Sequence, residues 1–207
     1  ADAALLAEPT GSVVEAGCQG TMRAVVTMGG RRAHSARSWT GVNAIHRLTP
    51  ILVSIAQYQA RQVTIDGCRF REGLQIVAIG GGVAGNVVPD EAKVTINFRF
   101  APDRTPAQAE AHVRSVIGPV DDFCVTDMAA AAAPDLGHPL LAALLKATGQ
   151  PARAKLGWTD VARLAGRGLP ATNFGPGDPN LAHSAEECVS RAELEAVYRA
   201  IRELIDG

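Results

Sequence analysis

The sequence lacks the features that mark several classes of protein. Its longest apolar runs, such as Ala129 to Ala133, are far too short to cross a bilayer. The 20 Lys and Arg residues are matched by 21 Asp and Glu residues, so there is no positive excess to neutralise phosphates. We therefore expect neither a membrane protein nor a nucleic-acid binder. What remains is the composition of an ordinary globular protein, 47% hydrophobic and 20% charged.

Paired cysteines are also missing. Cys18, Cys68, Cys124 and Cys188 are scattered singly and form no CxxC motif. This spacing excludes a zinc ribbon or a thioredoxin motif and predicts reduced thiols in the cytoplasm. The first residues hold no initiator Met and no positively charged signal region. The apolar run at residues 3–7 favours a buried strand with neighbours on both sides, so we expect a stretch preceding residue 1 that this chain does not contain.

Hydrophobic periodicity predicts one α+β unit between residues 17 and 127. Alternation favours strands at 20–28, 74–80 and 93–100, with a short strand at 123–125. Helical spacing favours a helix over 42–55, which Pro50 should kink or restart. A second helix should begin after Thr105, followed by a proline and a capping-box Gln108. The order β-α-β-β-α-β is typical of ferredoxin-like domains.

The rest of the chain alternates strand and helix in the manner of an α/β domain. We expect a helix at 139–148, a strand at 153–156, a short helix from 159, a strand at 171–174 and a final helix capped by Ser190 and Glu193. The predicted fold class is therefore a partial α/β domain (residues 1–16 and 128–207) with an inserted ferredoxin-like α+β domain (residues 17–127).

Three side chains follow strands closely enough to belong to a site. Glu8 and His183 lie directly beyond predicted strands, where ligands gather in open α/β sheets. Either could bind a metal, but from spacing alone a solvated turn glutamate is the favoured interpretation of Glu8, and a surface histidine is an even alternative for His183. His34 lies between a strand and a helix, with small neighbours that leave it room to project.

Two further residues lie within the α+β unit. Residues 80–85 match GxGxxG, but a strand follows them instead of a helix, so they predict no dinucleotide site and serve to present Asn86. Arg99 is on the polar face of its strand, beside Asn97. It could clamp a carboxylate through two hydrogen bonds, and a surface ion pair is equally well supported.

Taken together, these stretches resemble the co-catalytic zinc aminoacylase/carboxypeptidase family. The resemblance covers nearly the whole chain in family order: residues 8–10 (EPT), 15–20 (EAGCQG), 32–39 (RAHSARSW), 81–89 (GGVAGNVVP), 97–104 (NFRFAPDR), 157–161 (GWTDV) and 173–183 (NFGPGDPNLAH).

The resemblance implies a dizinc amidohydrolase that cleaves a small N-succinyl amide of a diamino acid and forms a homodimer through a lid domain. By this resemblance Glu8 and His183 are metal ligands, with two zinc ions per full-length subunit and cobalt as an alternative. The resemblance also implies that His34 is a catalytic residue, which reaches into the partner subunit's site and stabilises the oxyanion there. The resemblance implies that Asn86, Arg99, Thr159, Arg163 and Asn180 contact substrate.

The chain also departs from the family pattern. It has no counterpart of the family's first histidine ligand, bridging aspartate or glutamate pair, and Glu186-Glu187 follows the last ligand in the wrong place. We therefore expect this chain alone to bind little metal and to be inactive. The alternatives are a related deacylase or aminoacylase, such as an acetylornithine deacetylase, and a non-catalytic dimerisation module derived from the family.

Overall fold

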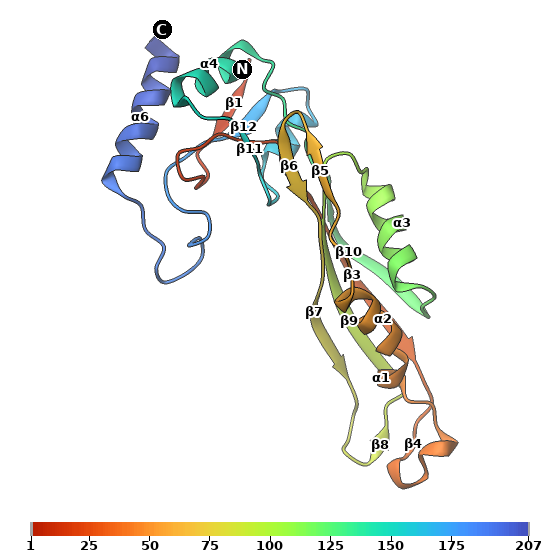
Figure 1. Ribbon diagram of the computed structural model, residues 1–207. Helices are drawn as coiled ribbons and strands as arrows, with labels where there is room; N and C mark the ends of the chain where they lie inside the picture. The colour runs from red at the N-terminus through yellow and green to blue at the C-terminus, as the bar shows by residue number, and fades with distance from the viewer. Residues whose placement is uncertain (1, 207) are drawn as a thin grey trace.

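The computed structural model describes residues 2–206, which form a small head and a long arm (Figure 1). We define the arm as residues 20–129 and the head as the described residues on either side of it. Both ends of the chain lie in the head, and the arm extends away from it. In residues 2–206 no helix combines the length and the apolar character needed to cross a membrane.

The arm is built on a four-stranded sheet with the order β10-β3-β9-β7. Every neighbouring pair in it is antiparallel. Its strands are β3 (Gly20–Gly29), β7 (Gly73–Gly81), β9 (Glu91–Phe100) and β10 (Asp122–Ala129). These four strands and the helices between them occur in the predicted β-α-β-β-α-β order, but short strands not predicted lie among them, and β10 is several residues longer than the strand expected at 123–125.

The arm's core lies between this sheet and three helices, α1 (Ala44–Arg47), α2 (Thr49–Ala56) and α3 (Pro106–Ile117). Alternate side chains of β9, including Val94, Ile96 and Phe98, are fully buried, as the alternation predicts. Burial of this apolar face is the main stabilising contribution to the arm.

The helix boundaries follow local sequence signals. Pro50 lies in the first turn of α2 and separates it from α1, so the predicted interruption is confirmed. A 3-10 helix (Ser35–Thr40) precedes α1. Thr105 and Gln108 form the expected capping box at α3, with Gln108 N–H donating to Thr105 Oγ1 at 3.2 Å and Thr105 N–H donating to Gln108 Oε1 at 2.8 Å.

Two short strand pairs were not predicted. The hairpin of β5 (Gln62–Ile65) and β6 (Cys68–Arg71) turns at Asp66 and Gly67, whose φ angles of 46° and 77° match a two-residue turn with positive φ at both positions. The second pair, β4 (Ala33–His34) with β8 (Val87–Val88), lies at the far tip of the arm (Figure 1).

The head contains a mixed sheet with the order β1-β12-β2-β11. Its strands are β1 (Ala4–Leu6), β2 (Glu15–Ala16), β11 (Arg153–Ala154) and β12 (Ala171–Asn173). Around it lie α4 (Pro139–Thr148), α5 (Val161–Ala165) and α6 (Arg191–Asp206), with the predicted Ser190–Glu193 cap at α6. The strand expected at residues 3–7 is present as β1; within residues 2–206 it pairs only with β12, and its side chains are half-buried.

Two antiparallel chain segments run side by side where the head meets the arm. Cys18 and Ala132 exchange two backbone hydrogen bonds, both 3.0 Å long. Gly17 adopts a φ of 62°, and a Cβ there would lie 2.5 Å from the Ala132 carbonyl oxygen. Glycine is therefore required here for both its backbone conformation and its lack of a side chain.

Candidate functional site

A cavity of about 870 Å³ lies on the side of the head that faces the arm. Its walls come from the segments after β1 and β12, from β11 and from the tip of the β5–β6 hairpin. The ionisable side chains that line it are Glu8, Glu15, Arg69, Arg153, Lys155 and His183. Both expected metal ligands, Glu8 and His183, therefore share one cavity with the candidate Asn180.

The parallel pairing of β1 with β12 brings Glu8 and His183 into this cavity. Parallel strands end at the same edge of a sheet, so the segments that follow them start side by side. Thr10 Oγ1 donates to Gly175 O and accepts from Gly175 N–H, both at 3.1 Å. A Cβ at Gly175 would lie 2.3 Å from Glu8 O, so this close approach requires glycine.

The loop that carries His183 is held by short-range hydrogen bonds. His183 has a φ of 66°, a left-handed conformation that is uncommon for residues other than glycine. Its N–H donates to Glu187 Oε2 at 2.9 Å. The backbone N–H and the side-chain amide of Asn180 both donate to Asp178 Oδ1 at 2.8 Å.

The zinc expectation can be tested against the donors present. Within residues 2–206 no group of three or more His, Cys, Asp or Glu side chains is placed to hold a metal ion. Glu8 and His183 share the cavity, but catalytic zinc sites use three protein ligands. The described residues therefore do not complete a zinc site by themselves.

An ion pair not predicted from the sequence crosses the cavity wall. Lys155 Nζ lies 2.8 Å from Glu15 Oε2, and both side chains are largely buried. Lys155 Nζ also donates to Pro9 O at 3.5 Å. The pairing of β11 with β2 brings these residues together, and nothing local in the sequence signals it.

Thr159 and Arg163 lie outside the lining of this cavity. Thr159 is buried, its Oγ1 has no hydrogen-bond partner in the described part of the chain, and Cys18 Sγ donates to its carbonyl oxygen at 3.8 Å. Arg163 lines a separate cavity of about 410 Å³, where its guanidinium lies 5.1 Å from the Trp158 ring centroid and 3.2 Å from Asp160 Oδ1. The structure does not place Arg163 beside Glu8 and His183.

His34 and Asn86 are neighbours at the tip of the arm. His34 pairs with Val87 across β4 and β8, and Ser35 N–H donates to Asn86 O at 2.9 Å. His34 Nδ1 accepts from Ala36 N–H at 3.0 Å, and both His34 and Asn86 are exposed. Figure 1 shows this tip at the opposite end of the molecule from the head.

Arg99 lies near the head end of β9, an inner strand of the arm sheet, half-buried and opposite Thr21 and Gly73. Burial lowers the pKa of its guanidinium, and the neighbouring Arg23 adds to this, while Asp127 acts in the opposite direction. The adjacent Asn97 donates to Thr21 Oγ1 and Met22 O, both at 3.3 Å. Arg99 does not line the head cavity.

Comparison with known proteins finds relatives that match along most or all of this chain. A protein of Mycobacterium tuberculosis, named as a succinyl-diaminopimelate desuccinylase, is 54% identical to this chain over its whole length. The match covers 59% of the M. tuberculosis protein. Succinyl-diaminopimelate desuccinylase of Corynebacterium glutamicum is 50% identical, and the match covers 90% of this chain and 52% of the C. glutamicum protein. This chain thus spans little more than half the length of these relatives.

Solved structures share the fold. The chain superposes on a tripeptidase from Staphylococcus aureus with a TM-score of 0.77 at 19% identity, covering 99% of this chain and 56% of that one. Aminopeptidase PepT from Bacillus cereus gives 0.72 with the same identity and coverage. The model of the M20 dimerisation family, described as a peptidase dimerisation domain, matches residues 17–122. The chain belongs to this M20 peptidase dimerisation domain family.

Proposed function

We propose that this chain is the dimerisation domain and part of the catalytic domain of a succinyl-diaminopimelate desuccinylase in the cytoplasm. That enzyme hydrolyses N-succinyl-LL-2,6-diaminopimelate to succinate and LL-2,6-diaminopimelate. The observation that carries the proposal is the 54% identity to a relative of that name over the full chain. The shared cavity of Glu8 and His183 is consistent with it.

In this proposal residues 1–16 and 128–207 belong to the catalytic domain and residues 17–127 to the lid. Glu8 and His183 are two ligands of a metal centre, for which zinc is the proposed ion and cobalt an alternative. Bound zinc would lower the pKa of a water molecule so that hydroxide is available near neutral pH. Because the described residues offer no group of three ligands, we expect this chain alone to bind little metal and to be inactive.

The remaining residues bind and orient the substrate. Asn180 lines the cavity beside His183, and the unpartnered hydroxyl of Thr159 is available to a ligand that reaches it. Arg99 and Asn86 are proposed to contact substrate from the arm, and Arg163 stays a weaker candidate because it lines another cavity. His34 is proposed to donate a hydrogen bond to the oxyanion that forms at the amide carbon.

The position of His34 supports a homodimer. Its tip is remote from the head of its own chain, so a second subunit is the simplest source of a cavity for it (Figure 1). The strand β7 offers the means of association. Within residues 2–206 it pairs only with β9, and Val77 and Ile79 on it are each 57% exposed. A free strand edge with apolar side chains is a surface that a second sheet can cover.

The test is turnover by the enzyme expressed from the complete gene, with N-succinyl-LL-2,6-diaminopimelate compared with N-acetylornithine. Preferential hydrolysis of the succinyl substrate supports the proposal. Preference for the acetyl substrate makes the protein a related deacylase. A dimer that binds no zinc and hydrolyses neither substrate identifies a non-catalytic dimerisation module.

A subunit-mixing experiment tests the two halves of the proposed site separately. His34→Ala removes the tip donor, and His183→Ala removes a cavity ligand, so each homodimer should be nearly inactive. Because a C2 dimer holds two sites, an equal mixture contains hybrids with one complete site, and about one quarter of wild-type activity should return. No recovery after verified subunit exchange contradicts a contribution of His34 to the partner's cavity.

A further inference from the structure

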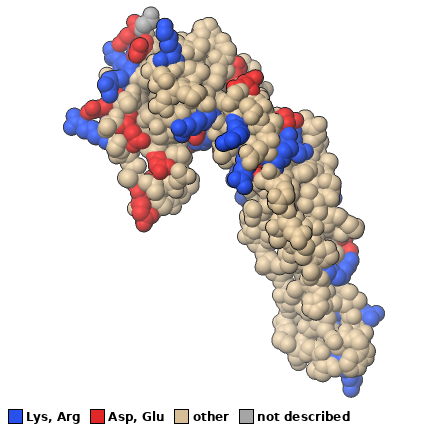
Figure 2. Space-filling model, viewed as in Figure 1, with Lys and Arg blue, Asp and Glu red and all other residues tan. Residues whose placement is uncertain are grey.

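The cavity of the head contains more positive charge than its own carboxylates neutralise. Lys155 is paired with Glu15 at 2.8 Å, which leaves Arg69 and Arg153 on the positive side and Glu8 on the negative side. Among residues 2–206, neither Arg69 nor Arg153 takes part in a salt bridge. Figure 2 shows Lys and Arg side chains gathered on the concave side where the head meets the arm.

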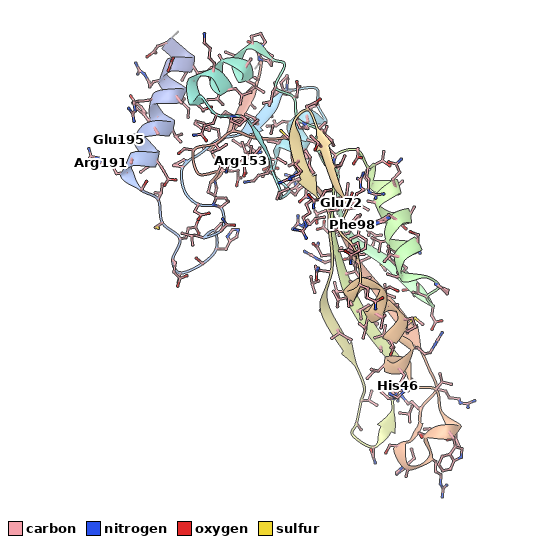
Figure 3. The ribbon with its side chains drawn as sticks, in the orientation of Figure 1. His46, Glu72, Phe98, Arg153, Arg191 and Glu195 are labelled. Carbon is pink, nitrogen blue, oxygen red and sulfur yellow. The ribbon has the colours of Figure 1, made fainter. Side chains whose placement is uncertain are left out.

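The two arginines come from neighbouring strands of different parts of the molecule. Arg153 is on β11 of the head, and Arg69 is on β6 of the hairpin, which contacts β11. Figure 3 shows Arg153 on the side of the head that faces the arm. On β6, Cys68 and Phe70 are buried in a cluster that includes Ala154, so strand alternation leaves Arg69 on the exposed face.

The hairpin is fixed at its base, so Arg69 is presented from a rigid element. Gln19, which is buried, donates from Nε2 to Arg71 O at 2.6 Å. Directly after β6, the fully buried carboxylate of Glu72 accepts hydrogen bonds from Arg61 and Arg104. A recognition residue held by such supports loses little conformational freedom when it binds a ligand.

We infer that Arg69 and Arg153 form a carboxylate-binding subsite that selects substrates whose acyl group ends in a carboxylate. The inference rests on the proposed function for its substrate and extends it by naming the residues that recognise the acyl group. A guanidinium donates two parallel hydrogen bonds to a carboxylate and keeps its charge at any physiological pH. The subsite lies in the same cavity as Glu8 and His183, so an amide held near those residues could extend its acyl chain toward the arginines.

The first experiment measures succinate binding to the 207-residue chain by calorimetry, with butanoate as the ligand that lacks the second carboxylate. Arg69→Gln and Arg153→Gln remove one positive charge each and keep much of the side-chain length. Arg71→Gln is the matched control, because it makes the same change two residues along β6 at an exposed side chain that does not line the cavity.

Each cavity variant should weaken succinate binding by about tenfold or more, as expected when a hydrogen bond to a charged group is lost. Arg71→Gln should leave it within about twofold, and butanoate should bind at least about tenfold more weakly than succinate. Equal affinity in all variants, or no succinate binding by the wild-type chain, overturns the inference.

Turnover by the complete enzyme separates this inference from the proposed function. If the wild type hydrolyses the N-succinyl substrate, Arg69→Gln should lower kcat/KM for it by about tenfold or more and leave an N-butanoyl analogue nearly unaffected. If Arg69→Gln and Arg71→Gln behave alike, the subsite is wrong and the proposed function stands. If the wild type hydrolyses neither substrate, the proposed function fails, and the succinate titration still decides whether the subsite exists.

Discussion

Glu72 and Arg104 are joined by two hydrogen bonds, from Arg104 Nε to Glu72 Oε1 at 2.7 Å and from Arg104 Nη2 to Glu72 Oε2 at 3.3 Å. The carboxylate is fully buried and also accepts from Arg61 and from the N–H of Ala101. It therefore ties the hairpin, the end of β9 and the start of α3 together at the top of the arm. Figure 3 labels Glu72 at this end of the arm.

Glu72→Ala should destabilise the fold by roughly 2–4 kcal/mol, because it leaves two partly buried guanidinium groups without their shared partner. Urea unfolding followed by circular dichroism measures the change. The control Glu110→Ala removes the exposed partner of Arg114 and should cost less than about 1 kcal/mol. Equal losses in the two variants would contradict a special role for Glu72.

The same carboxylate should make stability depend on pH. Burial alone would raise the pKa of Glu72, but hydrogen bonds from Arg61 and Arg104 outweigh it and hold the pKa below the ordinary value of a glutamate. A group whose pKa is lowered by folding stabilises the fold above its unfolded-state pKa, and this stability is lost as pH falls through the folded-state value. Unfolding free energies between pH 7 and 3 should therefore fall less steeply below about pH 5 in Glu72→Gln than in the wild type. Parallel curves would show that Glu72 does not titrate in this way.

Gly20 and Gly73 offer a matched test of packing in the arm sheet. A Cβ at Gly20 would lie 2.1 Å from the ring of Phe100, which is fully buried, whereas a Cβ at Gly73 would meet nothing within 4 Å. Gly20→Ala should cost about 1–3 kcal/mol through displacement of the ring. Gly73→Ala should change stability by no more than about 0.5 kcal/mol. Thermal unfolding of both variants distinguishes them, and a neutral Gly20→Ala would show that the ring has room to move.

The proposed dimer makes a prediction about β7. Val77→Glu places a charge on the exposed face of the free edge strand and should shift the protein toward monomer in sedimentation experiments. Val189→Glu makes the same substitution at an exposed valine of the head and should leave the assembly unchanged. A dimer that withstands the first substitution, or dissociates only with the second, places the interface elsewhere.

Local patterns predicted most of the arm. The alternation of Val94, Ile96 and Phe98 on one face of β9 requires no knowledge of distant residues, because burial of one face follows from the two-residue period of a strand. The hairpin β5–β6 was missed although Asp66-Gly67 is a strong turn signal, because each of its strands has only four residues and so offers a short stretch of alternation.

The candidate site was less predictable because it depends on pairing between distant strands. Glu8 and His183 could be named from their places after strands, whereas the ion pair of Lys155 with Glu15 exists only because β11 lies beside β2. From the sequence alone, Arg69 and Arg153 look like solvent-exposed strand residues. Only the contact of β6 with β11 places both side chains at one cavity. Thr159 and Arg163 illustrate the reverse case, since both were candidates from the sequence and neither lines the cavity of Glu8 and His183.

The backbone pairing of Cys18 with Ala132, where the chain enters and leaves the arm, has a consequence for the order of folding. Ala4 pairs with Ala171, so forming the head sheet from an unfolded chain requires closure of a loop that contains the whole arm. In the folded arm Thr21 is opposite Ala129, and the two ends of the insertion are neighbours. A folded arm therefore turns that long loop into a short one and lowers its closure entropy. The topology favours a folding order in which the arm, with its own core, forms early and the head sheet assembles across its base afterwards.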